Sequence, residues 1–285
     1  MSIPKFIGCV FLLCGLVYAF VLGRDLVKNR EALGQAPGDL KVLGVLEFIV
    51  FFLCTLGVSD FLLNTLLIKK LRLADDKSIP SCLIASTIVP GALIAFRDLM
   101  ADNTADTLTL LLFMLCLALG AAAGGRAVDR MDGATVRKMM GFALLFSMAA
   151  LVLKMIVSAG TTGSAVSLRG GKLLIMSLAC VGIGFINMTG VPCKPIATAM
   201  LLLLGLSPVA ALTLTLVLGA INPMSGGVAI VRGELYNRKM VLAAMTAGSV
   251  ASILGVVLAI SMNQLLLNIL LLIVMLIAVV SIFKN

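Results

Sequence analysis

Residues 182–198 read GIGFINMTGVPCKPIAT, and this stretch decides how the rest of the chain is interpreted. Apolar residues run up to Ile186 and resume at Ile196, whereas the residues between them are mostly polar residues, glycine or proline. Pro192 and Pro195 remove two backbone donors and disfavour helix just before them. We therefore expect one membrane helix to end here and another to begin after an unwound turn.

A cation, Lys194, lies within this expected turn. In hydrocarbon, a broken helix survives only where protein or a water-filled cavity receives the freed polar groups. A cation at mid-membrane costs about 2.5 to 3.5 kcal/mol on insertion scales. The turn is therefore predicted to receive an anionic substrate. The alternative is that Lys194 lies at the cytoplasmic surface, which holds if the helix ending at Asn187 is a full span.

The composition is that of a polytopic membrane protein. Of the 285 residues, 61% are hydrophobic and 12% are charged, and no soluble core absorbs so much apolar surface. Apolar segments recur from Phe6 to Phe283, which leaves no room for a soluble domain. The formal charge of +9 comes from basic residues dispersed over short loops, so orientation in the membrane explains it better than nucleic-acid binding.

The residue types present argue against a cofactor, a metal site or catalytic residues. The chain has no histidine, which is the commonest metal ligand. Its seven cysteines form no CxxC pair and are interpreted as small buried hydrophobes. Cys193 is the exception by position, because in the break it either touches substrate or simply packs. A membrane-embedded enzyme is disfavoured, since no paired acids and no nucleophile with a nearby base are evident.

The chain is predicted to be all-α and to divide into an N-terminal part and two copies of a membrane repeat. Residues 1–41 form a retained transmembrane helix and a cytoplasmic loop, residues 42–160 the first repeat, and residues 172–285 the second. In each copy a discontinuous hairpin precedes three further apolar segments. A second break is expected in each copy, at Pro90-Gly91 and at residues 222–227.

The two copies align by the order of their breaks and spans, with little identity. Residues 57–60 align with 184–187, Gly124 aligns with Gly255, and Met131-Asp132 aligns with Met262-Asn263. The aligned breaks place Asp60 over Asn187.

Basic residues indicate that the two copies have opposite orientations. The loops at 72–77 and 126–138 contain Lys and Arg, whereas their counterparts in the second copy contain none. Conversely, the loop at 97–106 has one basic residue and its counterpart at 232–239 has three. Because positive residues mark the cytoplasmic side, we predict two inverted repeats of about five segments with five crossings each, plus one N-terminal helix, in the cell (inner) membrane.

Corresponding breaks of inverted repeats meet near the bilayer midplane and supply the candidate substrate site. Half-helix N-termini carry partial positive charge and N–H groups that hold an oxyanion. The candidate substrate-binding residues are Ser59, Asp60, Asn64, Asn187, Thr189, Gly190, Cys193, Lys194, Asn222, Ser225 and Gly226. Asp60 is an interfacial cap, a proton carrier or the partner of Lys194. Asn222, Ser225 and the glycines are ligands or, equally, tight helix contacts.

The second copy carries a series of motifs in a characteristic order. After the break come a short apolar run, the motif GLSPVA at 205–210, a run ending in a small polar glycine cluster, and GEL at 233–235. This order resembles the TauE/SafE family of sulfite exporter-like permeases over residues 42–285, most strongly over 182–258. Family members carry a glycine-rich run followed by a proline in each copy. Here residues 58–60 have neither, and the second copy has only Gly190 before Pro192.

The resemblance implies transport of small sulfur-containing anions, such as sulfite and organosulfonates, and of other organic anions. The family's break positions fall on Asp60 and on residues 187–194. We therefore expect a permease for a small anion that works by alternating access in the lipid bilayer, with protons as a candidate coupling ion. The alternatives are a transporter of a cationic or neutral solute centred on Asp60, and a structural or assembly subunit.

Overall fold

The computed structural model describes residues 2–101, 105–128, 163–233 and 235–258, with isolated positions between 129 and 162. These residues are helical, with short connections and no strand longer than an isolated bridge. In chain order the elements are α1 (Ile3–Lys28), α2 (Arg30–Gln35), α3 (Leu40–Thr55), α4 (Asp60–Leu71), the 3-10 turn η1 (Asp76–Ser78), α5 (Ile79–Met100), α6 (Thr107–Val128), α8 (Gly170–Asn187), α9 (Lys194–Leu203), α10 (Pro208–Gly233), α11 (Arg238–Ala243), the π-helical turn η2 (Ala244–Gly248) and α12 (Ser249–Leu258).

Several predictions from the sequence fall outside this described part of the chain. They are the last apolar segment at 265–283, most of the segment between 138 and 160, and the alignment of Met131 with Met262-Asn263. The expected loop after the first helix is corrected, since α1 continues to Lys28 and α2 occupies much of the remainder.

Among the described residues, five helical segments are long and apolar enough to cross a membrane, and they contain α1, α5, α6, α8 and α10. Helices α5 and α10 are largely buried at the centre of the bundle. Helices α1 and α8 instead expose large apolar side chains, with Phe20 64% and Leu178 68% exposed. A bundle with a buried centre and an apolar outer face fits hydrocarbon surroundings, so the chain is an all-α polytopic membrane protein.

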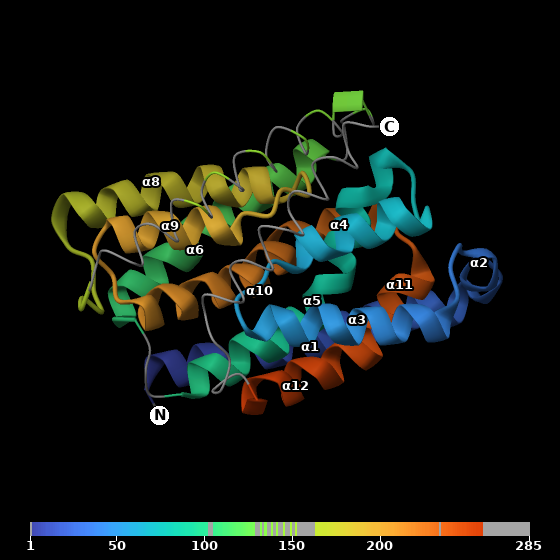
Figure 1. Ribbon diagram of the computed structural model, residues 1–285, viewed down its shortest axis with the longest axis horizontal. Helices are drawn as coiled ribbons and strands as arrows, with labels where there is room; N and C mark the ends of the chain where they lie inside the picture. Colours follow the sequence, from blue (N-terminus) through green and yellow to red (C-terminus); the bar gives the residue numbers. More distant parts are fainter. Residues whose placement is uncertain are drawn as a thin grey trace.

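Two series of elements follow each other in the same order, as the sequence predicts. Helices α3, α4, α5 and α6 are matched by α8, α9, α10 and the continuous run α11–η2–α12. Their packing is reciprocal, because α6 lies against α8 and the run α11–η2–α12 lies against α3, with α5 and α10 in contact between them. Figure 1 shows α8 and α9 at one side of the bundle and α3 and α12 at the other.

Each series opens with a helical hairpin that returns to the end of the bundle where it began. The Asn237 side-chain Nδ2 donates to the Pro37 carbonyl at 3.0 Å and to the Leu73 carbonyl at 2.9 Å, so both ends of the α3–α4 hairpin lie together. For the α8–α9 hairpin, the Ser207 N–H donates to the Ala165 carbonyl at 2.8 Å.

The returning arms of both hairpins are too short to cross a membrane. At 1.5 Å per residue, the 12 residues of α4 span about 18 Å and the 10 residues of α9 about 15 Å, against a hydrocarbon core of about 30 Å. The hairpins are therefore re-entrant, and the expectation of five crossings per copy is corrected for them. Without the two hairpin arms, three of the five expected crossings remain in each copy. An odd number of crossings still gives consecutive copies opposite orientations, so this part of the prediction is unaffected.

The loops predicted to be cytoplasmic meet at one end of the bundle. Asp25 accepts hydrogen bonds from Arg238 Nε at 2.9 Å and from Tyr236 at 2.8 Å, and Lys239 Nζ donates to the Gly38 carbonyl at 3.1 Å. At the opposite end of α5, Arg169 Nη1 lies 2.8 Å from Asp106 Oδ2. The observed grouping agrees with the two sides that the charge pattern predicts.

The expected second breaks are corrected, because both positions lie inside continuous helices. Pro90 is within α5, and Pro223 is within α10, which also contains Asn222, Ser225 and Gly226. A proline inside a helix removes one backbone hydrogen bond, and packing in the bundle compensates for it. Next to Pro223, the Tyr18 hydroxyl of α1 donates to the Met224 carbonyl at 2.6 Å.

Close backbone contacts between α6 and α8 are made through glycine. A Cβ atom added at Gly124 would lie 2.5 Å from the Phe185 carbonyl oxygen, and one added at Gly184 would meet the backbone of Leu117 and Ala121. Gly120 meets the backbone of Val181 in the same way. These glycines allow two membrane helices to pack at backbone distance.

We predict that Gly184→Ala destabilises the bundle by about 1–3 kcal/mol, because backbone atoms of α6 must move to admit the methyl group. Gly182→Ala on the same helix is the matched control, since nothing lies within 4 Å of its added Cβ. Thermal unfolding of both purified variants measures the difference. Equal melting temperatures would show that α6 and α8 are not held at backbone distance.

Candidate functional site

The first break separates α3 from α4 and is closed by a glycine turn. Gly57 has a φ of +88°, a backbone conformation that side chains with a Cβ rarely adopt. The Gly57 N–H donates to the Cys54 carbonyl and the Val58 N–H to the Leu53 carbonyl, which is the Schellman arrangement at a helix C-terminus. Asp60 then begins α4, so its carboxylate lies at the positive end of that helix.

The second break separates α8 from α9 and uses a similar turn. Gly190 has a φ of +91°, and its N–H donates to the carbonyl of Asn187, the last residue of α8. The Asn187 side chain bridges the break, because its Nδ2 donates to the Val191 carbonyl at 2.8 Å. Helix α9 begins at Lys194 with Pro195 in its first turn, where a missing N–H costs nothing.

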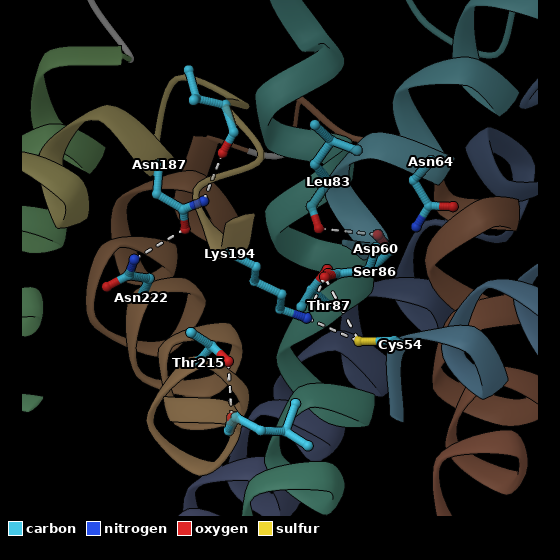
Figure 2. Close-up of polar contacts among 12 residues, drawn as sticks. Cys54, Asp60, Asn64, Leu83, Ser86, Thr87, Asn187, Lys194, Thr215 and Asn222 are labelled. Carbon is cyan, nitrogen blue, oxygen red and sulfur yellow. Dashed lines mark hydrogen bonds and ion pairs between the residues drawn. The ribbon is translucent and has the colours of Figure 1, made fainter. Parts of the chain in front are cut away.

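The N-termini of the two half-helices meet through a buried ion pair. Lys194 Nζ lies 2.7 Å from Asp60 Oδ1, and the two residues are only 5% and 1% exposed. Figure 2 shows the Lys194 side chain extending across the site toward Asp60. The surface position for Lys194 is therefore wrong, as is an interfacial cap for Asp60. The expectation that Asp60 is the partner of Lys194 is confirmed.

Two further side chains complete the surroundings of the pair. The Thr87 hydroxyl of α5 donates to Asp60 Oδ2 at 2.6 Å, so both carboxylate oxygens are bonded. Lys194 Nζ also lies 2.9 Å from the Cys54 sulfur at the end of α3. The ammonium passes close to α10, because a Cβ added at Gly219 would lie 2.9 Å from Lys194 Cε and 3.0 Å from Nζ.

An amide pair lies beside the lysine. Asn222 Nδ2 of α10 donates to Asn187 Oδ1 at 3.1 Å, and both side chains are buried. The Asn222 Oδ1 atom is buried and has no hydrogen-bond partner among the described residues. Figure 2 shows this pair on the opposite side of Lys194 from Asp60 and Thr87. The lysine thus lies between a carboxylate and a pair of neutral amides.

The other predicted residues lie in or near the breaks with different surroundings. Asn64 is one turn from Asp60 on α4, but its Nδ2 donates to Glu47 Oε2 at 3.3 Å. The Thr189 hydroxyl donates to the Ile186 carbonyl at 2.7 Å, which caps the end of α8. Ser59 and Cys193 are buried residues that precede the two half-helices.

Ser225 and Gly226 are not in the break turns. Ser225 is half-buried on α10. A Cβ at Gly226 would meet Met188 and the Ala121 carbonyl, so this glycine makes a tight helix contact.

Cys54, Thr87 and Gly219 at the ion pair were not predicted from the sequence. They are small residues inside apolar helices and carry no local signal. Glu47, the partner of Asn64, was also missed although a signal was present. It is the only acidic residue in the apolar run 42–57, and an intramembrane carboxyl group is by default a candidate functional residue.

The fold and site define a class of protein. It is an all-helical polytopic membrane protein in which two re-entrant broken hairpins bring a buried ion pair together inside the bundle. A family model described as "Sulfite exporter TauE/SafE" matches residues 61–283, and the chain belongs to this family of membrane permeases. No curated protein and no solved structure matches the chain. The family match agrees with the resemblance seen in the sequence, and transport agrees with the absence of a predicted enzyme site.

We predict that the ion pair contributes to stability only as a pair. Lys194→Met leaves Asp60 buried without its cation and Asp60→Asn leaves the ammonium without its anion, so each lowers the free energy of unfolding by about 3–5 kcal/mol. The double variant removes both charges and retains most of the stability. Unfolding midpoints in one detergent measure this, with exposed Lys70→Met as control. Additive losses in the double variant would contradict the pairing.

Proposed function

We propose that the chain is a permease of the cell (inner) membrane that moves a small anion by alternating access, with Lys194 as the cation that binds it. A sulfur oxyanion or an organosulfonate such as sulfite is the proposed substrate. The observation that carries this proposal is the placement of Lys194, a buried cation at the N-terminus of a half-helix between the two repeats. An anion there meets an ammonium group, helix N–H groups and neutral amide donors.

Asp60 has the role of a resident counter-ion in this proposal. Its carboxylate neutralises Lys194 when no substrate is present, at a distance of 2.7 Å. An arriving oxyanion competes with that carboxylate for the ammonium group. Asp60 keeps its hydrogen bond from Thr87 when it is displaced, so the carboxylate is not left without a donor.

The same competition supplies a reason for a conformational change. Asp60 begins α4 of the first repeat and Lys194 begins α9 of the second, so their ion pair joins the two hairpins. Substrate that replaces Asp60 loosens this connection between the repeats. Movement of one repeat against the other around a fixed site is how inverted-repeat transporters expose the site to alternate sides.

Anion binding is expected to respond in opposite directions to the two charge-removing variants. Lys194→Met abolishes binding, whereas Asp60→Asn removes the competing carboxylate and tightens binding by about tenfold or more. Thermal stabilisation of purified protein by sulfite, thiosulfate, sulfate, taurine, sulfoacetate and simple carboxylates measures this. Anion at about 100 times its dissociation constant stabilises the folded form by about 2.7 kcal/mol.

The double variant Lys194→Met with Asp60→Asn is the folded control for this experiment, and Lys70→Met is the charge-removing control on the surface. An anion that stabilises the double variant as well as the wild type would remove Lys194 from the site. Asp60→Asn losing the response, with Lys194→Met retaining it, would favour the alternative permease for a cationic or neutral solute centred on Asp60. Unchanged behaviour of every variant would favour a structural subunit.

A further prediction concerns the space beside the lysine. We expect Gly219→Ala to weaken anion binding by about tenfold, because the new methyl group overlaps Lys194 Cε and Nζ and displaces the ammonium group. Gly227→Ala on the same helix is the matched control, since its Cβ meets only side-chain atoms of Ile88 and Ile84 and none of Lys194. The anion-dependent thermal shift compares them. Equal shifts would show that the ammonium position does not determine affinity.

A further inference from the structure

A second buried carboxyl group, that of Glu47 in α3, lies outside the proposed anion site. The residue is 0% exposed, and its Oε2 accepts a hydrogen bond of 3.3 Å from Asn64 Nδ2. Within the part of the chain that the structure describes, Glu47 Oε1 and Asn64 Oδ1 are buried without hydrogen-bond partners. Two orphaned oxygens therefore belong to two side chains that are already in contact.

A single proton placed between Glu47 Oε1 and Asn64 Oδ1 gives both unpaired oxygen atoms a hydrogen bond. A carboxylic acid and a primary amide pair through two hydrogen bonds, in which the amide N–H donates to one carboxyl oxygen and the acid O–H donates to the amide oxygen. The first of these bonds is present between Asn64 and Glu47. A proton on Glu47 Oε1 supplies a donor for the other. An ionised carboxylate has no such donor and carries a large desolvation cost in this setting.

No cation faces Glu47 from the helices packed around it, among the described residues. The titratable groups that act on it are Asp60 of α4 and Cys82 of α5. Lys69 of α4 is paired with Asp76. The run 240–258 of α11, η2 and α12, which packs on α3, has no charged residue. Glu47 therefore lacks the kind of partner that Lys194 gives to Asp60.

A metal cation fits this position poorly. Hard cations such as Ca²⁺ take six to eight oxygen ligands, and a carboxyl group with one amide supplies few of them. The described ranges also contain no group of three or more His, Cys, Asp or Glu side chains able to hold a metal ion. A proton needs only the carboxyl group and its amide partner.

Glu47 is connected to the ion pair along both helices of the first hairpin. On α3 it shares the buried stripe with Cys54, two turns further on, whose sulfur contacts Lys194 Nζ at 2.9 Å. On α4 its partner Asn64 lies one turn from Asp60. Figure 2 shows Asn64 beyond Asp60 as seen from Lys194.

We propose that Glu47, hydrogen-bonded to Asn64, is a proton-binding site that couples anion transport to proton movement in the same direction. The proposal rests on the anion permease function proposed above. With its proton, Glu47 is neutral and adds no negative charge near Asp60. Without the proton, its carboxylate repels both Asp60 and an incoming anion. Proton and anion therefore favour each other's binding, and this coupling is reciprocal.

Glu47→Gln tests the site because glutamine imitates the protonated side chain. Its Nε2 can donate to Asn64 Oδ1 and its Oε1 can accept from Asn64 Nδ2, so we expect no loss of stability. Infrared spectroscopy of the purified protein should show the carbonyl band of a protonated carboxyl group in wild type and its loss in Glu47→Gln. Glu31→Gln, which removes an exposed carboxyl group on α2, should retain the band. A band of unchanged frequency and intensity in Glu47→Gln would overturn the proposal.

Transport in proteoliposomes gives a second readout, with radiolabelled sulfoacetate as a probe that stays ionised through the pH range used. In wild type, a pH gradient that is acidic on the side of the anion should drive accumulation. Glu47→Gln should reduce this accumulation by about tenfold or more and still exchange labelled for unlabelled anion, since exchange does not require the proton to leave. Accumulation equal to wild type in Glu47→Gln would overturn the proposal. No exchange and no anion binding in wild type would contradict the permease function instead.

Discussion

A charged side chain inside a membrane bundle needs a partner of opposite charge, and the arrangement of this protein depends on the partner of Lys194. The ammonium group begins a half-helix, where the helix dipole is unfavourable to it, and it is almost fully buried. Asp60 begins the other half-helix, where the dipole favours a carboxylate. Their contact at 2.7 Å therefore stabilises the ammonium group, which its own helix end disfavours, with a carboxylate that its own helix end favours.

The same constraint explains the form of the two hairpins. A chain that turns back inside a membrane exposes polar backbone, so the turn must be buried in protein. Glycine residues with positive φ make both turns compact, and the central helices α5 and α10 cover them. Reciprocal packing of α6 on α8 and of α12 on α3 then encloses each hairpin with an element of the other series. The turn of each hairpin is therefore positioned by contacts with both series of helices.

The sequence predicted the class of fold and the positions of the two principal breaks, because proline, glycine and charge are visible inside apolar runs. It did not predict which residues meet. Aligning Asp60 with Asn187 was off register, since Asp60 and Lys194 are the residues that begin equivalent half-helices. The sequence pattern predicts breaks at Pro90 and Pro223 because a proline costs one backbone hydrogen bond, whereas central packing keeps both helices continuous. Thr87 reaches Asp60 only through tertiary packing, which no local pattern encodes.

The two buried acids of the first hairpin differ in a way that separates their proposed roles. Asp60 has an ammonium and a hydroxyl donor on its two oxygens, so it is suited to stay ionised as the counter-ion of Lys194. Glu47 has a single amide contact and an orphaned oxygen, so it is suited to carry a proton. Because Asp60 and Asn64, the hydrogen-bond partner of Glu47, lie one turn apart on α4, a change of charge at Glu47 acts on Asp60. In this proposal the anion displaces the carboxylate of Asp60, and the proton binds the nearby carboxyl group of Glu47. These two groups are the minimum needed to couple anion movement to proton movement.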